Sequence, residues 1–169
     1  HHLEKINNMS FDDIVKFIES KAADQSSRIE GKEALIVSPD NWIEISTLLK
    51  NESDLDFDYL MCISSYDKGD GKIYGVAYNL FSTTKNHYLE VRVETEDGKS
   101  IPSVVSLWKT ANWHEREAYD MMGIQFEGHP NLKRILLSDD WEGYPLRKNF
   151  KEPDYYHGMP VPKDKSYWE

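Results

Sequence analysis

The sequence predicts a two-layer α+β domain, in which a mainly antiparallel sheet is packed by helices on one face, followed by an extended C-terminal arm. Three observations lead to this expectation. Two segments near the N-terminus carry apolar residues at the three- and four-residue spacing of a helix. Three segments between residues 59 and 94 have the composition of strands. After residue 138 this periodicity ends, and prolines and aromatic residues follow instead.

The first helix is expected to begin at Ser10, because serine caps helices and an acidic residue, Asp13, stands at the third position after it. A second helix is expected after Ser38, with Pro39 in its first turn, where the missing N–H of proline is tolerated. A short buried strand, residues 33–38, precedes this helix. The apolar stripes are Phe11, Ile14, Val15 and Ile18 in the first helix, and Trp42, Ile45, Leu48 and Leu49 in the second.

Three longer strands are expected at residues 59–66, 73–81 and 88–94, with a turn at 67–71 between the first two. In the third strand Leu89, Val91 and Val93 alternate with Glu90, Arg92 and Glu94. Such alternation indicates a sheet with one face on a core and the other toward water or a partner.

Two further helices are expected, a short one at residues 104–109 and a longer one at residues 112–122. Asn112 is a good capping residue, and Glu115 stands three positions later, where it can close a capping box. Gly123 follows, and glycine tolerates the left-handed conformation that ends many helices.

The length of 169 residues suits a single domain, expected at residues 10–138. Residues 1–9 are interpreted as a tag remnant or a flexible N-terminus, since the chain opens with His1 and His2. Residues 139–169 are expected to form an extended docking arm. Proline interrupts helices and strands, whereas disordered tails are poor in aromatic residues, so an extended segment lying on another protein fits both features.

The composition excludes several classes of function. Thirty acidic residues against twenty basic ones give a net charge of −10, which disfavours binding to nucleic acid. A single cysteine, Cys62, excludes an internal disulfide and an iron–sulfur cluster held by cysteines of this chain. No apolar run approaches the roughly 20 residues that a membrane-spanning helix needs.

The charged segment 113–122 allows two interpretations. Glu115 and Glu117 could form an acid/base couple, together with His114 and Asp120, in a stand-alone hydrolase. However, residues two positions apart point to opposite sides of a helix, so the two glutamates are poorly placed to flank one bond. The other interpretation is a capping box followed by a solvated helix face.

Residues 115–136 closely resemble the signature of the 30 kDa subunit, also called the C subunit, of proton-pumping NADH:quinone oxidoreductase, the respiratory complex I. The lead-in at 102–113 and the continuation at 139–148 also match that family. The matched signature positions are Glu115, Arg116, Glu117, Asp120, Gly123, Phe126, Gly128, His129, Pro130 and Arg134.

This resemblance implies a non-catalytic structural subunit of the peripheral arm of the complex, with no catalytic, cofactor-binding or metal-binding residue of its own. It implies docking beside the 49 kDa-type subunit and the iron–sulfur subunits, near the quinone-reducing end, on the cytoplasmic side of the bacterial inner membrane. FMN, the iron–sulfur clusters and quinone are expected in those partner subunits. The complex as a whole is an oxidoreductase that translocates protons.

Physical roles follow for the matched residues as hypotheses. Arg116, Arg134 and Arg147 suit bidentate pairing with carboxylates, within the domain or across an interface. His129 is expected to be a hydrogen-bonded structural histidine. The candidates for interface contacts are Trp141, Tyr144, Pro145, Arg147, Phe150, Tyr155 and Tyr156.

Two alternatives to membership in complex I stay open at this point. One is the equivalent subunit of a membrane-bound nickel–iron hydrogenase complex, which belongs to the same wider family. The other is the stand-alone hydrolase, which predicts that its carboxylates converge in one concave pocket with perturbed pKa values.

Overall fold

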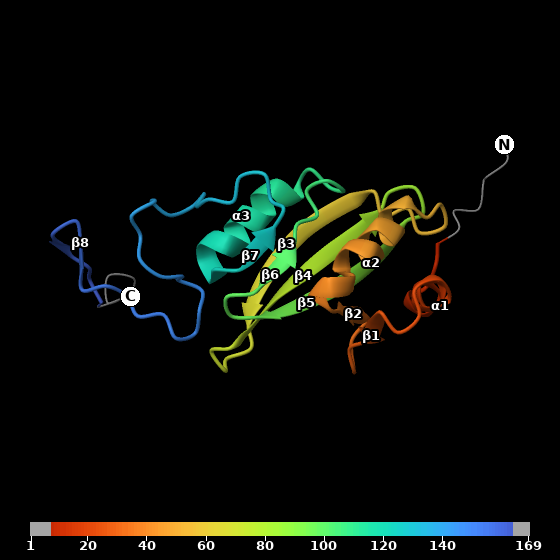
Figure 1. Ribbon diagram of the computed structural model, residues 1–169, viewed down its shortest axis with the longest axis horizontal. Helices are drawn as coiled ribbons and strands as arrows, with labels where there is room; N and C mark the ends of the chain where they lie inside the picture. The colour runs from red at the N-terminus through yellow and green to blue at the C-terminus, as the bar shows by residue number, and fades with distance from the viewer. Residues whose placement is uncertain (1–7, 164–169) are drawn as a thin grey trace, which may run out of the picture.

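The computed structural model describes residues 8–163, and Figure 1 shows its elements. The helices are α1 (Phe11–Lys21), α2 (Pro39–Asn51) and α3 (Ala111–Met122). The strands are β1 (Ser26–Arg28), β2 (Ala34–Val37), β3 (Tyr59–Asp67), β4 (Ile73–Ser82), β5 (His87–Glu96), β6 (Ser100–Pro102), β7 (Gln125–Glu127), β8 (Tyr155–Tyr156) and β9 (Met159–Pro160). The two predicted N-terminal helices and the strands at 33–38, 59–66, 73–81 and 88–94 are present.

Five strands form the main sheet in the order β1-β2-β5-β4-β3. All neighbours are antiparallel except β2 and β5, which pair in parallel. The parallel pair places β2 beside β5 although α2, β3 and β4 separate them in the sequence. The prediction of a mainly antiparallel sheet is confirmed.

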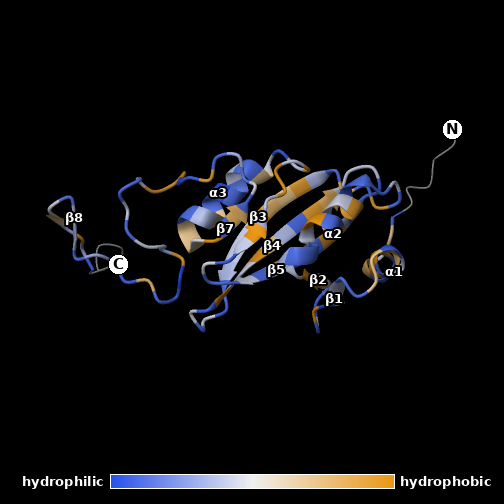
Figure 2. Cartoon of the chain, viewed as in Figure 1, coloured by the Kyte–Doolittle hydropathy of each residue, from blue (hydrophilic) through white to orange (hydrophobic). Residues whose placement is uncertain are grey.

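The core lies between one face of this sheet and the helices. Apolar residues from α1, α2 and α3 join those of the inner sheet face in one buried cluster, as the alternation predicts. Its largest fully buried side chains include Trp42 of α2 and Tyr74 and Tyr78 of β4. Figure 2 shows hydrophobic residues on the strands where the helices cover them. The opposite face leaves Tyr59, Met61 and Tyr88 exposed. The predicted α+β fold is therefore confirmed.

The expectation of a short helix at 104–109 is wrong. The backbone N–H groups of Leu107 and Trp108 both donate to the carbonyl of Val104, which closes a single turn, and α3 begins only at Ala111. Tertiary bonds hold this segment in place, because the indole N–H of Trp108 donates to the carbonyl of Phe57 at 2.9 Å. The turn is thus stabilised by contacts distant in sequence.

The capping box at Asn112 and Glu115 is also wrong. The residue before α3 is Thr110, in a helical conformation and without a side-chain cap bond. Asn112 lies inside the helix, and Glu115 faces the interior of the domain. By contrast, Ser10 caps α1 as predicted, since its hydroxyl accepts a hydrogen bond from the N–H of Asp13.

Beyond β7 the described chain forms no helix or strand until β8, and it runs along one end of the domain before extending away from it (Figure 1). The boundary at 138 stays a prediction, and so does the interpretation of residues 1–9, most of which lie outside the described residues. Within residues 8–163, no helix is long and apolar enough to cross a bilayer.

Candidate functional site

Glu115 is fully buried on the inner side of α3. Its carboxylate accepts hydrogen bonds from the hydroxyl of Ser103 at 2.6 Å and from the N–H of Val104 at 2.8 Å. Burial raises the pKa of Glu115 to about 7, against the lowering effect of these two bonds. Glu115 therefore joins α3 to the connection between β6 and α3, at Ser103 and Val104, and does not cap its own helix.

His129 stands next to this carboxylate, with Nε2 3.9 Å from the Glu115 carboxylate. The same Nε2 lies 3.0 Å from the carbonyl oxygen of Asn112, and Nδ1 accepts from the N–H of Asn131 at 3.0 Å. Both ring nitrogens therefore have a backbone partner within hydrogen-bonding distance. His129 thus serves as a hydrogen-bonded link between α3 and the chain after β7.

Asp120, one turn further along α3, is also fully buried but has a different environment. Its Oδ2 accepts three consecutive backbone N–H bonds, from Ile135 at 3.0 Å, Leu136 at 2.7 Å and Leu137 at 2.9 Å. Its Oδ1 accepts from Arg134 at 2.7 Å. Although burial alone would raise it, these bonds hold the pKa of Asp120 below its ordinary value. The carboxylate anchors the beginning of the C-terminal segment.

Arg134 extends this anchor toward the rest of the arm. Its Nη2 donates to the carbonyl oxygens of Trp141 at 3.1 Å and Gly143 at 3.0 Å. The guanidinium thus joins Asp120 to the loop at residues 141–143, which lies seven to nine residues after Arg134 itself. It does so with the several N–H donors of its planar group, which lysine lacks. Within the described part of the chain, Arg116 pairs with no carboxylate, and it donates to the carbonyls of Lys133 and Arg134, both at 3.1 Å.

Gly123 ends α3 in the left-handed conformation, with φ of +76°, as the sequence predicted. It also sits against the returning arm, because a Cβ built there would lie 2.6 Å from the ring of Tyr144 and 2.7 Å from Nη2 of Arg147. Glycine is needed here for two reasons, its backbone conformation and the close approach of the arm.

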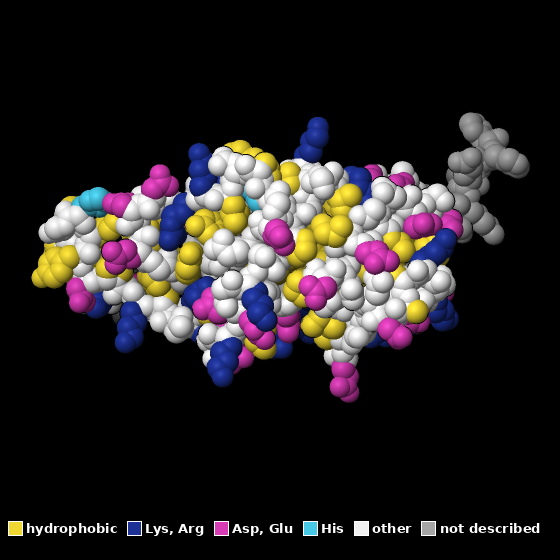
Figure 3. Space-filling model, viewed as in Figure 1, with side chains coloured by type: hydrophobic (Ala, Val, Ile, Leu, Met, Phe, Trp, Pro, Cys, Tyr) yellow, Lys and Arg dark blue, Asp and Glu magenta, His cyan; other side chains and the backbone are white. Residues whose placement is uncertain are grey.

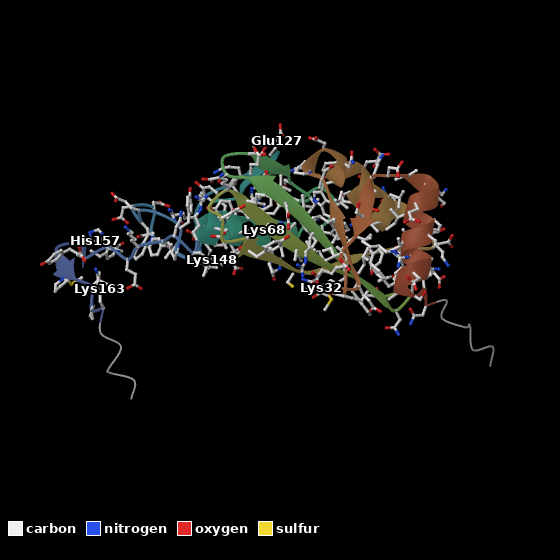
Figure 4. All side chains as sticks on the ribbon, turned by 90° about the horizontal axis from the view of Figure 1, so that it is seen from below. Lys32, Lys68, Glu127, Lys148, His157 and Lys163 are labelled. Carbon is white, nitrogen blue, oxygen red and sulfur yellow. The ribbon has the colours of Figure 1, made fainter. Side chains whose placement is uncertain are left out.

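Arg147 fastens the arm a second time. Its Nε donates to the carbonyl of Met122 at 2.8 Å, and its two terminal nitrogens bind Asp97 at 2.8 and 3.3 Å. The guanidinium lies 4.3 Å from the ring centre of Tyr74 and 4.8 Å from that of Tyr144. Next to it, the N–H of Lys148 donates to Asp67 at the β3–β4 turn, and Lys148 lies near Lys68 in Figure 4.

The remaining signature residues have simpler positions. Phe126 is buried in β7, Glu117 is exposed on α3, and Gly128 turns the chain with φ of +81° before the exposed Pro130. Among the predicted interface residues, Tyr155 is exposed, whereas the others are half-buried against their own chain. Those half-buried residues are Trp141, Tyr144, Pro145, Arg147, Phe150 and Tyr156.

The structure also reveals exposed apolar side chains that sequence reasoning missed. Leu136, Leu146 and Met159 are 62%, 55% and 64% exposed, respectively. The backbone N–H of Leu136 donates to the Asp120 carboxylate, and that of Leu146 donates to the carbonyl of Met121, so α3 fixes the backbone from which both side chains project. Only the absence of helical or strand periodicity after residue 138 could have suggested that side chains here do not belong to the core.

The carboxylates of α3 do not form a shared catalytic site. Glu115 and Asp120 are buried and bonded to separate parts of their own chain, whereas Glu117 is exposed. Among residues 8–163, no group of three or more His, Cys, Asp or Glu side chains is arranged to hold a metal ion. What the site does is hold a C-terminal arm on one end of the domain.

The fold of this chain also occurs in a solved structure. A chain in the solved structure of the membrane-bound sulfane sulfur reductase, described as an archaeal respiratory membrane complex, has the same fold with a TM-score of 0.70. It is 24% identical, and the match covers 83% of this chain and 85% of that one. The chain belongs to the family of the respiratory-chain NADH dehydrogenase 30 kDa subunit, whose model matches residues 35–156. The resemblance seen in the signature is therefore confirmed.

Curated relatives agree with this membership. The C subunit of NADH-quinone oxidoreductase from Chlorobium phaeobacteroides is 42% identical over 151 residues, which cover 86% of this chain and 91% of the relative. Its counterpart from Chloroherpeton thalassium is 50% identical over 125 residues, and there the match spans 73% of this chain but only 52% of the relative. The J subunit of NAD(P)H-quinone oxidoreductase from Prochlorococcus marinus is 38% identical over 134 residues, covering 75% of this chain and 76% of the relative.

Proposed function

We propose that this chain is a structural, non-catalytic subunit of the peripheral arm of an NADH:quinone oxidoreductase. It docks beside the 49 kDa-type and iron–sulfur subunits, near the quinone-reducing end, on the cytoplasmic side of the bacterial inner membrane. In this proposal FMN, the iron–sulfur clusters and quinone are bound by the partner subunits. Electron transfer is therefore their chemistry, and this chain contributes to assembly.

The observation that carries the proposal is the anchored arm. Arg134 and Arg147 hold residues 134–148 on the end of α3, yet several apolar side chains of this segment and of the arm beyond it are exposed. These are Leu136, Leu146, Tyr155 and Met159. Figure 3 shows hydrophobic side chains gathered at the end of the arm, on the left. A segment that is already ordered loses less conformational entropy on binding, so its apolar surface can contribute more to affinity.

The test is co-purification of the complex from native membranes that carry variants of this protein. Tyr155→Ala with Met159→Ala removes two exposed side chains from the arm. Tyr59→Ala with Met61→Ala is a matched control, because it removes the same two residue types from the sheet face, where they are also exposed, to 48% and 46% against 68% and 64% in the arm. We expect the arm variant to lose most of the 49 kDa-type subunit, as quantified by mass spectrometry, while the control retains it.

Equal recovery from both variants and the wild type would overturn docking through the arm. Loss from the sheet-face variant alone would move the interface to the other side of the domain. The partners recovered also separate the respiratory complex from the hydrogenase alternative: flavin- and NADH-binding subunits belong to the first, and a nickel–iron subunit to the second.

A further inference from the structure

The far end of the arm contains a pocket that the anchoring bonds do not use. β8 and β9 form a small hairpin that folds back toward residues 140–142. Between them lies a cavity of about 250 Å³. The side chains that form it are aromatic, Trp141, Tyr155 and Tyr156, and acidic, Asp140 and Glu142, with His157 beside them. His157 is labelled near the end of the arm in Figure 4.

The walls of this pocket are held by contacts within the arm. The ring of Tyr156 lies 5.2 Å from that of Trp141 and 4.3 Å from that of His157, measured between centres. The Tyr156 hydroxyl is 2.6 Å from the hydroxyl of Ser138 and donates to Asp140 at 3.3 Å. The aromatic surfaces therefore have a set geometry before anything binds.

The pocket also has an excess of negative charge. A hydrogen bond from Ser138 holds the pKa of Asp140 below its ordinary value, so this side chain is a carboxylate at neutral pH. His157 Nε2 lies 2.8 Å from Oδ2 of Asp140, and the exposed Glu142 adds a second carboxylate. Two cations of the same segment are paired with other carboxylates, Arg134 with Asp120 and Lys163 with Asp154. Aromatic faces combined with carboxylates are the chemistry that recognises a cation.

Trp141 also provides a way to detect a ligand in the pocket. Its ring lines the cavity, and its indole N–H is buried with no acceptor among residues 8–163. A ligand that stacks on this ring changes the surroundings of the N–H, so the N–H resonance reports on binding.

We propose that this pocket receives an arginine side chain of a partner protein in the complex, stacked on the aromatic rings and paired with Asp140 and Glu142. Arginine fits better than lysine, because its planar guanidinium both stacks on aromatic faces and pairs bidentately with a carboxylate. The inference rests on the proposed docking function and deepens it, since it assigns the chemistry of one contact in that interface.

The first test is a titration of the full chain, followed by the NMR resonance of the Trp141 indole N–H. The probe is N-acetyl-arginine amide, and N-acetyl-citrulline amide is the matched control, because citrulline has nearly the same shape without the charge. Trp141→Phe identifies the resonance by its disappearance. We expect a saturable shift with the arginine probe, with a Kd on the order of 1–10 mM, and little shift with citrulline. The double variant Asp140→Asn/Glu142→Gln should abolish the response.

The second test uses the assembled complex. Asp140→Asn/Glu142→Gln should weaken retention of the partner proteins in a salt-wash series at least tenfold, as measured by the fraction that dissociates. Glu152→Gln/Asp154→Asn is the control, because it removes the same two charges from the same arm outside the carboxylates of the pocket. We expect this control to change retention less than twofold.

Equal shifts from the arginine and citrulline probes would overturn the inference, as would equal weakening by the two pairs of charge variants. If the Tyr155→Ala/Met159→Ala variant loses its partners while Asp140→Asn/Glu142→Gln retains them fully, the arginine pocket is excluded but docking through the arm is not. If neither variant affects assembly, the proposed docking function fails as well.

Discussion

Glu115→Gln should stabilise the protein at alkaline pH, and the gain should disappear as the pH falls. The ordinary pKa of a glutamate, 4.5, rises to about 7 in the folded chain because Glu115 is buried, and its hydrogen bonds from Ser103 and Val104 offset only part of that effect. Glutamine has nearly the same shape. Its carbonyl can accept from the N–H of Val104, and its amide can donate to the hydroxyl of Ser103.

The sign follows from proton linkage. The folded state holds its proton up to about pH 7, whereas the unfolded chain releases it near pH 4.5, so the wild type loses stability as the pH rises between these values. Relative to a residue that does not titrate, the loss is about 1 kcal/mol at pH 5.5 and about 3 kcal/mol at pH 8.5. Any fixed cost of the amide is the same at both values. The difference between variant and wild type should therefore shift by about 2 kcal/mol in favour of glutamine.

Urea unfolding, followed by tryptophan fluorescence at pH 5.5, 7 and 8.5, measures this difference. Glu117→Gln is the matched control, because it makes the same change two residues away on the exposed side of α3. It should alter the free energy of unfolding by less than about 0.5 kcal/mol at every pH. A Glu115→Gln effect that does not change with pH would refute the reasoning, since it would mean that burial does not disfavour the ionised carboxylate.

Three further predictions concern the anchoring of the arm. Asp120→Asn should lower the free energy of unfolding by about 3–5 kcal/mol, because it removes the fully buried carboxylate that pairs with Arg134 and accepts three backbone N–H bonds; a loss below 1 kcal/mol in urea unfolding would contradict this. Gly123→Ala should cost about 2–4 kcal/mol, since it combines a left-handed backbone with a clash against the arm. Gly128→Ala, with a similar φ but open space around it, should cost only about 1–2 kcal/mol, and equal losses would exclude the clash. Arg147→Lys should make the arm several-fold more susceptible to limited proteolysis while the far-ultraviolet circular dichroism stays unchanged, because lysine cannot make the forked contacts or the stacking; an unchanged cleavage rate would show that Arg147 does not hold the arm.

The elements that sequence reasoning located are those whose signal is local. Ser10 caps α1, Pro39 opens α2, and Gly123 ends α3 in the conformation that glycine favours. Helical and strand periodicity also identified the three long strands to within two residues of their observed ends. Each of these features depends on a few neighbouring residues, so a single sequence is enough to indicate it.

The errors occurred where a local pattern competed with a distant partner. Glu115 has the spacing of a capping box, but Ser103 and Val104 compete for its carboxylate and hold it in the interior. Residues 104–108 form a single turn where a helix was expected, and Trp108 in this turn bonds to Phe57, 51 residues away. The strands β6 and β7 have three residues each, too few to show an alternating pattern.

By itself, the sequence determined the fold class and the family, because these depend on periodicity, composition and a contiguous signature. The division into a patterned domain and a proline-rich arm stays a prediction. Only the tertiary structure decided what the signature residues do. Asp120 binds three N–H groups 15 to 17 residues away, and Arg147 reaches Asp97 across 50 residues. Which of these partners a side chain binds is decided when the domain folds around it, because burial makes any unpaired polar group costly. The spacing of residues along the chain does not contain this information.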